Sequence, residues 1–197
     1  TYDGDGGPIA VRTIDPHCLD FLISDPAFGN VHTNLFNTRD WLVERPEPSL
    51  LVYHEHSGFS YRVTDFALLD RDRIIKVFYY GEPAELRDIQ AYIREHCGEL
   101  VSTTFSLPFT LEVMAEGVSK GAALERVCAL RGIDRAATLA FGDGPNDVEM
   151  LRAAGLGVLV ANADPKLKAA LPGNPVIATN EDEAVARFLE QLFLEKS

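Results

Sequence analysis

The most informative alternation of apolar and polar positions lies in residues 138–151. A short apolar run ends at Gly142, aspartates follow at positions 143 and 147, and an apolar run with helical spacing then begins. This order predicts a buried strand, a tight loop and a helix. Because ligands of open α/β sheets bind at the carboxyl ends of the strands, the loop is a candidate binding site.

From residue 112 onward, short apolar runs alternate with amphipathic segments. Besides the strand that ends at Gly142, the pattern predicts strands at 157–160 and 176–179, and helices from Ser119 to Gly132, at 165–170 and at 182–194. Strands that alternate with helices form a parallel sheet with helical crossovers. The fold class expected for this part is therefore α/β.

The first half of the chain has a different pattern, a short helix followed, over residues 30–108, by what is typical of a small mixed sheet with two helices on one face. The expected elements are strands at 31–36, 41–43, 74–80, 100–106 and 110–114, and helices at 16–23, 46–53 and 82–96. Residues 37–40 should form a hairpin turn. We expect a core remnant and linker over 1–29, an α+β domain over 30–110, and the C-terminal part of an α/β core over 111–197.

Composition narrows the possible partners. The formal net charge is −12 and lysines and arginines do not cluster, which excludes a nucleic-acid groove. No apolar run is long enough to span a bilayer, so we expect no membrane partner. The cysteines at 18, 97 and 128 form no Cys-x-x-Cys pair. They favour buried thiols, a reducing compartment and hence a cytoplasmic location.

The loop after residue 142 favours a metal site. Asp143 leaves the strand, and Asn146 and Asp147 open the helix, whose free backbone N–H groups favour an anion. Two carboxylates beside a helix start that favours an anion are unfavourable unless a cation binds with them. Carboxylate oxygens together with a phosphate are the ligands that suit Mg²⁺. The alternative is structural, with Asp143 or Asn146 acting only as a helix N-cap.

Lys120 is a candidate phosphate ligand. It lies in the first turn of a predicted helix, where a cation is disfavoured unless an anion lies nearby. The alternative is a solvated lysine. Two other patterns are given structural interpretations: His54-Glu55-His56 lacks a third metal ligand and is taken as a solvated helix end, and Asp3-Gly4-Asp5-Gly6 is taken as a turn.

Several segments together resemble the Cof-type haloacid-dehalogenase-like (HAD) phosphatases. They are Ser-Lys-Gly-Ala-Ala-Leu at 119–124, Ala-Phe-Gly-Asp-Gly-Pro-Asn-Asp-Val-Glu-Met-Leu at 140–151, Ala-Gly-Leu-Gly-Val at 154–158 and Asn-Ala at 162–163. Segments at 34–37, 57–61, 76 and 111–113 resemble the family's cap domain. These cap segments look most similar to a Cof phosphatase that acts on the pyrimidine diphosphate precursor of thiamine.

The resemblance implies a Mg²⁺-dependent phosphatase of small phosphate esters, such as sugar, pyrimidine or pyridoxal phosphates. It would have a Rossmann-like core and an α+β cap that closes over the site, and it would work through an aspartyl-phosphate. By position, Asp143 and Asp147 would serve the metal, Lys120 and Asn146 would bind phosphate, and Lys120 and Asp147 would be catalytic. Trp41, His54 and Tyr61 are candidates for substrate specificity. The assembly would be a monomer or a homodimer.

One family segment has no match. The family's nucleophile lies in an Asp-x-Asp-Gly-Thr segment after a first strand, and residues 3–7 imitate it without that strand. We therefore expect the nucleophile, and the first part of the core, to lie outside these 197 residues. The alternatives are a phosphomutase or other phosphotransferase on the same scaffold, and a non-catalytic binding module.

Overall fold

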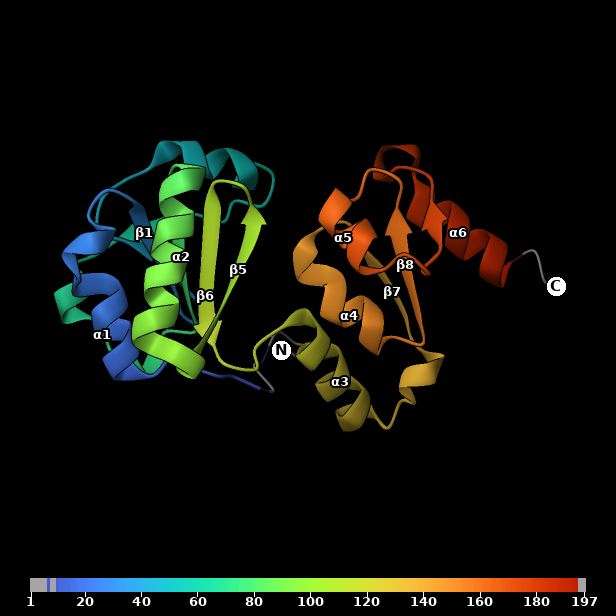
Figure 1. The fold of residues 1–197 in the computed structure, drawn as a ribbon, viewed down its shortest axis with the longest axis horizontal. Helices are drawn as coiled ribbons and strands as arrows, with labels where there is room; N and C mark the ends of the chain where they lie inside the picture. Colours follow the sequence, from blue (N-terminus) through green and yellow to red (C-terminus); the bar gives the residue numbers. More distant parts are fainter. Residues whose placement is uncertain (1–6, 8–9, 195–197) are drawn as a thin grey trace. The chain divides into compact units, whose positions relative to one another are not determined.

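The computed structural model describes residue 7 and residues 10–194. The chain divides into two compact units, Thr1–Val118 and Ser119–Ser197, which are described separately below (Figure 1). The Asp-x-Asp pattern at residues 3–5 lies outside the described residues. Among the described residues, no helix is both long enough and apolar enough to cross a bilayer.

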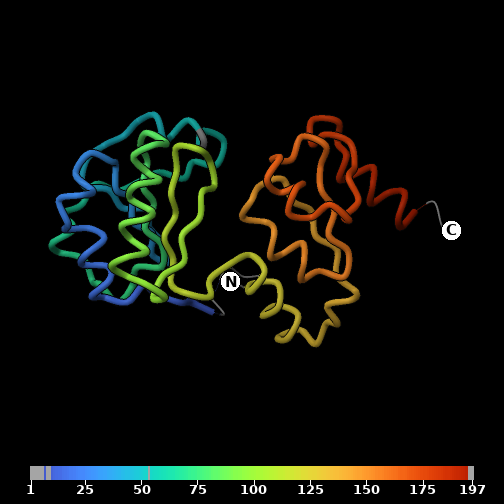
Figure 2. The backbone as a smooth tube through the Cα atoms, viewed as in Figure 1, coloured from blue at the N-terminus to red at the C-terminus, as the bar shows by residue number. Residues whose placement is uncertain are grey.

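The first unit is built on a six-stranded sheet with the strand order β3-β2-β1-β4-β6-β5. Its strands are β1 (His32–Phe36), β2 (Trp41–Val43), β3 (Tyr61–Val63), β4 (Lys76–Tyr80), β5 (Val101–Leu107) and β6 (Thr110–Ala115). All neighbours are antiparallel except β2 and β3, which are parallel. Figure 2 follows the chain through the adjacent β5 and β6. The predicted hairpin is confirmed, because β1 and β2 pair antiparallel.

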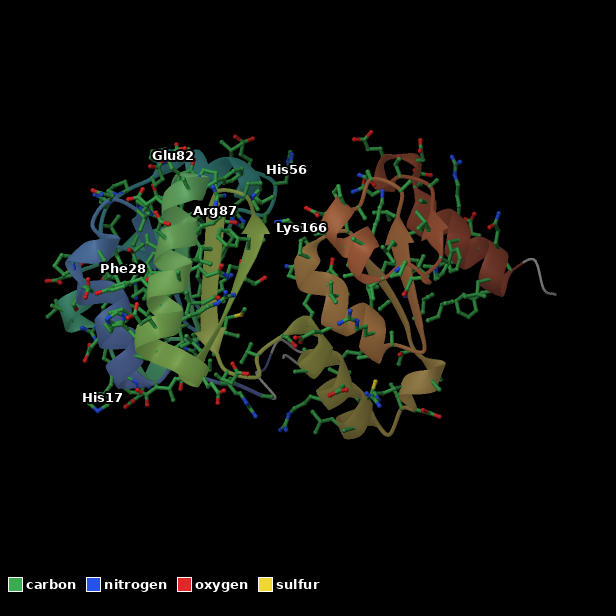
Figure 3. The ribbon with its side chains drawn as sticks, viewed as in Figure 1. His17, Phe28, His56, Glu82, Arg87 and Lys166 are labelled. Carbon is green, nitrogen blue, oxygen red and sulfur yellow. A yellow bond between two sulfur atoms is a disulfide. The ribbon has the colours of Figure 1, made fainter. Side chains whose placement is uncertain are left out.

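Two helices, α1 (Pro16–Ser24) and α2 (Pro83–Cys97), cover one face of this sheet. A proline in the first turn of α2 and Gly98 after it, with φ 53°, explain why the helix begins and ends there. The two helices bury a core with the inward strand residues Leu35, Val77 and Tyr79. In Figure 3, Phe28 lies in this part of the unit, where its ring stacks on that of Tyr79 at 5.1 Å between centroids.

The opposite face of the sheet carries a second, smaller buried cluster. There Trp41 and Val43 are buried together with Leu50, which lies on the 3₁₀ helix η2 (Pro48–His54). The sequence predicts an α-helix here, and the structure corrects it to the tighter 3₁₀ form. The other short 3₁₀ helices of the unit are η1 (Pro26–Phe28), η3 (Phe66–Leu68), η4 (Arg71–Arg73) and η5 (Gly98–Leu100).

The cysteines differ from the prediction. Cys18 on α1 and Cys97 at the end of α2 are joined by a disulfide, with their Cα atoms 5.9 Å apart, whereas Cys128 is free and buried. The expectation of buried thiols is therefore wrong for two of the three cysteines. Sequence spacing could not reveal the pair, because its members are 79 residues apart and meet only when both helices pack on the sheet. The cysteines no longer argue for a reducing compartment, and the cytoplasmic location stays a prediction.

The second unit contains a parallel sheet in the order β7-β8-β9. Its strands are β7 (Leu139–Gly142), β8 (Leu156–Val160) and β9 (Val176–Ile177). Its α-helices are α3 (Lys120–Arg131), α4 (Val148–Ala153), α5 (Pro165–Ala170) and α6 (Ala184–Phe193). Its short 3₁₀ helices are η6 (Arg135–Ala137), η7 (Pro145–Asp147) and η8 (Asn180–Asp182). The predicted α/β class, with a parallel sheet and helical crossovers, is confirmed. The predicted strand at 138–142, its tight loop and the helix that follows are confirmed as well.

Helices cover both faces of this sheet. Ala140 of β7 and Leu159 of β8 pack with Leu151 of α4 in one buried cluster. Phe141 alternates to the opposite face, where its ring meets that of Phe188 on α6 at 5.8 Å between centroids. A parallel sheet buried on both faces leaves its loops as the exposed places for chemistry.

Candidate functional site

The site is organised by the carboxylate of Asp147, at the end of η7. Its Oδ1 accepts a hydrogen bond from Lys120 Nζ at 2.5 Å. Its Oδ2 accepts the backbone N–H groups of Asp143 at 2.9 Å and Gly144 at 3.0 Å. One carboxylate thus ties the start of α3 to the loop that follows β7, and both of its oxygens are occupied.

Two glycines allow this close approach. A Cβ atom at Gly121 would lie 2.8 Å from Glu149 Cβ and 2.9 Å from the Glu149 backbone carbon, so α3 and α4 pack almost backbone to backbone. A Cβ atom at Gly142 would lie 2.7 Å from Asp147 Cβ. Small residues at both positions therefore bring Lys120 within reach of Asp147.

Burial differs sharply across the ion pair. The Asp147 side chain is 3% exposed and that of Lys120 is 49% exposed. Burial alone would raise the pKa of Asp147, but the hydrogen bond from Lys120 and the two backbone N–H groups together hold it below its ordinary value. The Asp147 side chain is therefore a carboxylate at neutral pH, and it holds the half-exposed side chain of Lys120.

This pairing changes the interpretation of Lys120. Ser119 caps α3, with its hydroxyl accepting the N–H of Ala122 at 3.1 Å, so Lys120 is indeed in the first turn. The anion that compensates the unfavourable helix dipole is the protein's own Asp147. An ammonium group has three donors, and among the described residues Lys120 gives one of them to Asp147, so it can still donate to an anionic ligand.

Asp143 and Asn146 lie in the same loop and are not helix caps. The N-cap of η7 is Gly144, and no side chain caps α4, so the N-cap alternative is wrong. Asp143 is exposed and, in the described part of the chain, its carboxylate accepts no hydrogen bond, while its backbone C=O accepts the N–H of Asp164 at 2.8 Å. Asn146 is half-buried, with Oδ1 2.8 Å from where a Gly144 Cβ would lie.

The oxygens of this loop can supply only part of a metal site. Within residues 7 and 10–194, no three His, Cys, Asp or Glu side chains lie together in a way that could hold a metal ion. Mg²⁺ nevertheless needs only one or two carboxylates, since water and phosphate complete its octahedron. The exposed Asp143 carboxylate fits as one such ligand, whereas both oxygens of Asp147 are already engaged by N–H donors.

The remaining candidates lie in the first unit. Trp41, His54 and Tyr61 are brought together, because the Trp41 ring lies 5.2 Å from that of His54 and 5.3 Å from that of Tyr61. His56 is exposed, and Figure 3 shows it projecting from the ribbon. His54 packs on aromatic rings. The interpretation of this string as a solvated helix end fits His56, whereas His54 is half-buried against aromatic rings.

Sequence reasoning missed two contributors to the site. Gly121 was recognised only as part of a motif, although a glycine directly after the lysine could have signalled a close helix contact. The backbone N–H of Asp164, which fixes the loop at Asp143, carries no signal in the sequence because a backbone group is common to almost every residue.

A doubly covered α/β unit with a Lys–Asp pair at the carboxyl end of a parallel strand, in one chain with a separate α+β unit, has the architecture expected of a HAD-like hydrolase. The sequence profile of haloacid dehalogenase-like hydrolases matches residues 2–189. The chain belongs to this family, and the Cof-type resemblance is confirmed.

Named relatives agree with this assignment. A Haemophilus influenzae protein, provisionally named a phosphatase, is 38% identical over 166 residues, which cover 84% of this chain and 61% of that protein. The HMP-PP phosphatase of Yersinia pestis strain Pestoides F is 32% identical over 187 residues, covering 95% of this chain and 68% of that protein. The chain thus spans between three fifths and seven tenths of the length of these relatives.

Solved structures share the fold. A Thermotoga maritima crystal structure is 28% identical with a TM-score of 0.77, covering 96% of this chain and 71% of that one. A haloacid dehalogenase-like hydrolase from B. subtilis is 24% identical with a TM-score of 0.82, covering 98% of this chain and 76% of that one. The second likeness is evidence for the fold alone.

Proposed function

We propose that the protein is a Mg²⁺-dependent phosphatase that hydrolyses phosphate esters of small metabolites to the free alcohol and phosphate. One observation carries the proposal: a buried carboxylate, Asp147, binds the half-exposed ammonium of Lys120 with one oxygen and the backbone N–H of Asp143 with the other, while the Asp143 side chain is exposed. A cationic donor at the start of α3 and an exposed carboxylate in the loop after β7, joined by one buried carboxylate, suit a ligand that is itself anionic and metal-bound.

In this proposal each residue has a distinct role. Lys120 binds a phosphoryl oxygen and offsets negative charge that develops on it during hydrolysis. Asp147 positions Lys120 and, through the backbone of Asp143 and Gly144, fixes the loop. The amide of Asn146 donates a hydrogen bond to the phosphate.

Asp143 would be one ligand of Mg²⁺, which supplies Lewis-acid polarisation of the phosphoryl group when bound. Asp147 would act on the metal only indirectly, because its oxygens already accept three hydrogen bonds. The family resemblance implies an aspartyl-phosphate, and we assign its nucleophile to none of the described residues.

The substrate class belongs to the proposal too. Relatives about one third identical are named HMP-PP phosphatase, which favours a pyrimidine diphosphate, with sugar and pyridoxal phosphates as alternatives. We expect a monomer or homodimer in the cytoplasm that acts on a small molecule.

The test is phosphate release by the purified full-length gene product. It is given a panel of pyrimidine, sugar and pyridoxal phosphates, with Mg²⁺ or with excess EDTA. Release of inorganic phosphate that needs Mg²⁺ supports the proposal. Transfer of the phosphoryl group to a second substrate without release would show a phosphotransferase instead, and no turnover of any ester would indicate a binding module.

A further inference from the structure

The backbone of Asp143 is held on both sides by other aspartates. Its N–H donates to Asp147 Oδ2 at 2.9 Å, and its C=O accepts the N–H of Asp164 at 2.8 Å. The Asp143 carboxylate, in contrast, is exposed and accepts no hydrogen bond from the residues that the structure describes. The direction of this carboxylate therefore depends on the two hydrogen bonds of its backbone.

Asp164 lies in the loop between β8 and α5, and its side chain is the N-cap of that helix. Its Oδ1 accepts the backbone N–H of Lys166 at 2.7 Å. Its C=O accepts the N–H of Lys168 at 3.1 Å, at the start of the hydrogen bonds of α5. One residue thus joins the helix to the Asp143 loop, because its side chain and C=O bind α5 while its N–H binds Asp143.

The helix α5 is anchored in the core of the second unit. Leu167 is fully buried and lies in one cluster with Leu151 of α4 and Leu159 of β8. Pro165 at the first helical position has the φ angle that a helix needs. With six residues, α5 is too short to be stable by itself, so its first turn depends on this packing and on the N-cap.

The same loop is also held from the third strand of the sheet. Asn162 Nδ2 donates to Asn180 Oδ1 at 2.6 Å, and Asn162 Oδ1 accepts the N–H of Asn180 at 3.2 Å. Asn180 follows β9, so these bonds join the ends of neighbouring strands. The loop is fixed at residue 162 by this pair and at Asp164 by the N-cap, so the N–H that binds Asp143 has a defined direction.

We infer that Asp164 is a positioning residue for Asp143 and that it acts through its N-cap. The inference rests on the proposed role of Asp143 as a ligand of Mg²⁺. While the cap is formed, the N–H of Asp164 holds the C=O of Asp143, and the Asp143 carboxylate is oriented before the ion binds. Without the cap the first turn of α5 frays, and the loop must be ordered when the metal binds, which weakens binding.

The test measures Mn²⁺ binding to the full-length gene product by electron paramagnetic resonance, without substrate. Mn²⁺ replaces Mg²⁺ because both ions take octahedral sets of oxygen ligands. Asp143→Asn measures the background from other acidic groups, since the formal net charge of the 197 residues is −12. The readout needs no turnover, so a protein that binds Mn²⁺ but hydrolyses no ester would contradict the proposed function and leave the comparison of variants valid.

Removal of the cap should weaken the metal site. Asp164→Ala should lower the affinity for Mn²⁺ about tenfold, the lower end of the effect of partners that orient a metal ligand. Asp164→Asn keeps an oxygen that caps a helix equally well, and its affinity should stay within about twofold of that of the unaltered protein. An equal loss in both variants would mean that the charge of Asp164 acts on the metal instead of the cap, and would overturn the proposal.

The matched control is Asp134→Ala, which should leave the affinity for Mn²⁺ unchanged. Asp134 caps η6 in the same way, with its Oδ1 accepting the N–H of Ala136 at 3.0 Å, but η6 precedes β7 and the Asp143 loop follows that strand. A comparable loss in Asp134→Ala, an unchanged affinity in Asp164→Ala, or binding by the unaltered protein no tighter than by Asp143→Asn overturns the proposal. If circular dichroism shows that Asp164→Ala does not fold, Asp164→Thr replaces it as a weaker cap and should lower the affinity about fivefold.

Discussion

The two units present charged side chains in opposite ways. In the second unit the candidate groups follow a parallel strand, within one loop, and are tied by a single carboxylate to the start of one further helix. In the first unit Lys76, the first residue of β4, and Glu112, inside β6, project from antiparallel strands onto a sheet face. A loop holds its polar groups at a strand end without disturbing the core, whereas charged groups on a sheet face share that surface with aromatic side chains.

The units also differ in how they are held together. A disulfide joins the two helices that cover the first unit's sheet, whereas the one cysteine of the second unit, Cys128, is free. The second unit depends on close helix packing at Gly121 and on sheet burial from both faces. The comparison predicts that a substitution in the second unit has the largest effect on turnover. It also predicts that reduction of the disulfide lowers the stability of the first unit alone.

The largest expected effect is on turnover. Lys120→Ala removes the ammonium that we assign to the phosphoryl group, and loss of one such stabilising group costs about 10²–10³-fold in rate. The measurement is kcat for phosphate release by the full-length gene product. The control is Lys166→Ala, an exposed lysine on α5 of the same unit, labelled in Figure 3, which should leave kcat unchanged. Full activity in Lys120→Ala would mean that this lysine has another role.

Reduction of the disulfide should give the next largest effect. Cys18 and Cys97 are 79 residues apart, and a closed loop of that length stabilises a fold by about 2–4 kcal/mol. Denaturant unfolding followed by Trp41 fluorescence reports on the first unit. Dithiothreitol should lower its midpoint, Cys18→Ala should lower it without further sensitivity to dithiothreitol, and Cys128→Ala should keep that sensitivity. An unfolding midpoint that dithiothreitol does not change would show that the disulfide does not stabilise the first unit.

The sequence was enough to predict the loop site because its residues are neighbours in the chain. Gly142, Asp143 and Asp147 span six positions, and the pattern of strand, turn and helix around them is local. The sequence also predicts Lys120 as a phosphate ligand, because it lies at the start of a helix and within the family motif. What remained hidden was its partner: only the packing of α3 on α4 brings Lys120 to Asp147.

The first unit is less predictable because its key contacts join residues that are distant in the sequence. Its strands and the long helix α2 follow from local periodicity, but the Lys76–Glu112 pair and the Cys18–Cys97 disulfide join distant parts of the chain. The strand order that places β4 between β1 and β6 decides both the face and the pair. Strand order is set by tertiary packing, and no short window of residues encodes it.

A smaller effect should follow from crowding the contact between α3 and α4. Gly121→Ala places a methyl group 2.8 Å from Glu149 Cβ, and overpacking of this kind costs about 1–3 kcal/mol. Gly173→Ala is the control, because a Cβ there meets nothing within 4 Å and should be neutral. Urea denaturation followed by far-ultraviolet circular dichroism compares the two. Equal stability of both variants would contradict the tight packing that brings Lys120 to Asp147.

The smallest effect concerns acid. The folded pKa of Asp147 lies below its ordinary value of 3.8, so its ionised form stabilises the fold above that pH, and the contribution disappears as pH falls below 3.8. At pH 7, Asp147→Asn should therefore be less stable than the unaltered chain by an amount on the order of 1 kcal/mol, and the gap should narrow toward pH 3. Glu125→Gln, at an exposed pair with Arg135, should change little at either pH. A gap that widens on acidification would mean that the carboxylate is neutral in the folded protein, which its three N–H donors argue against.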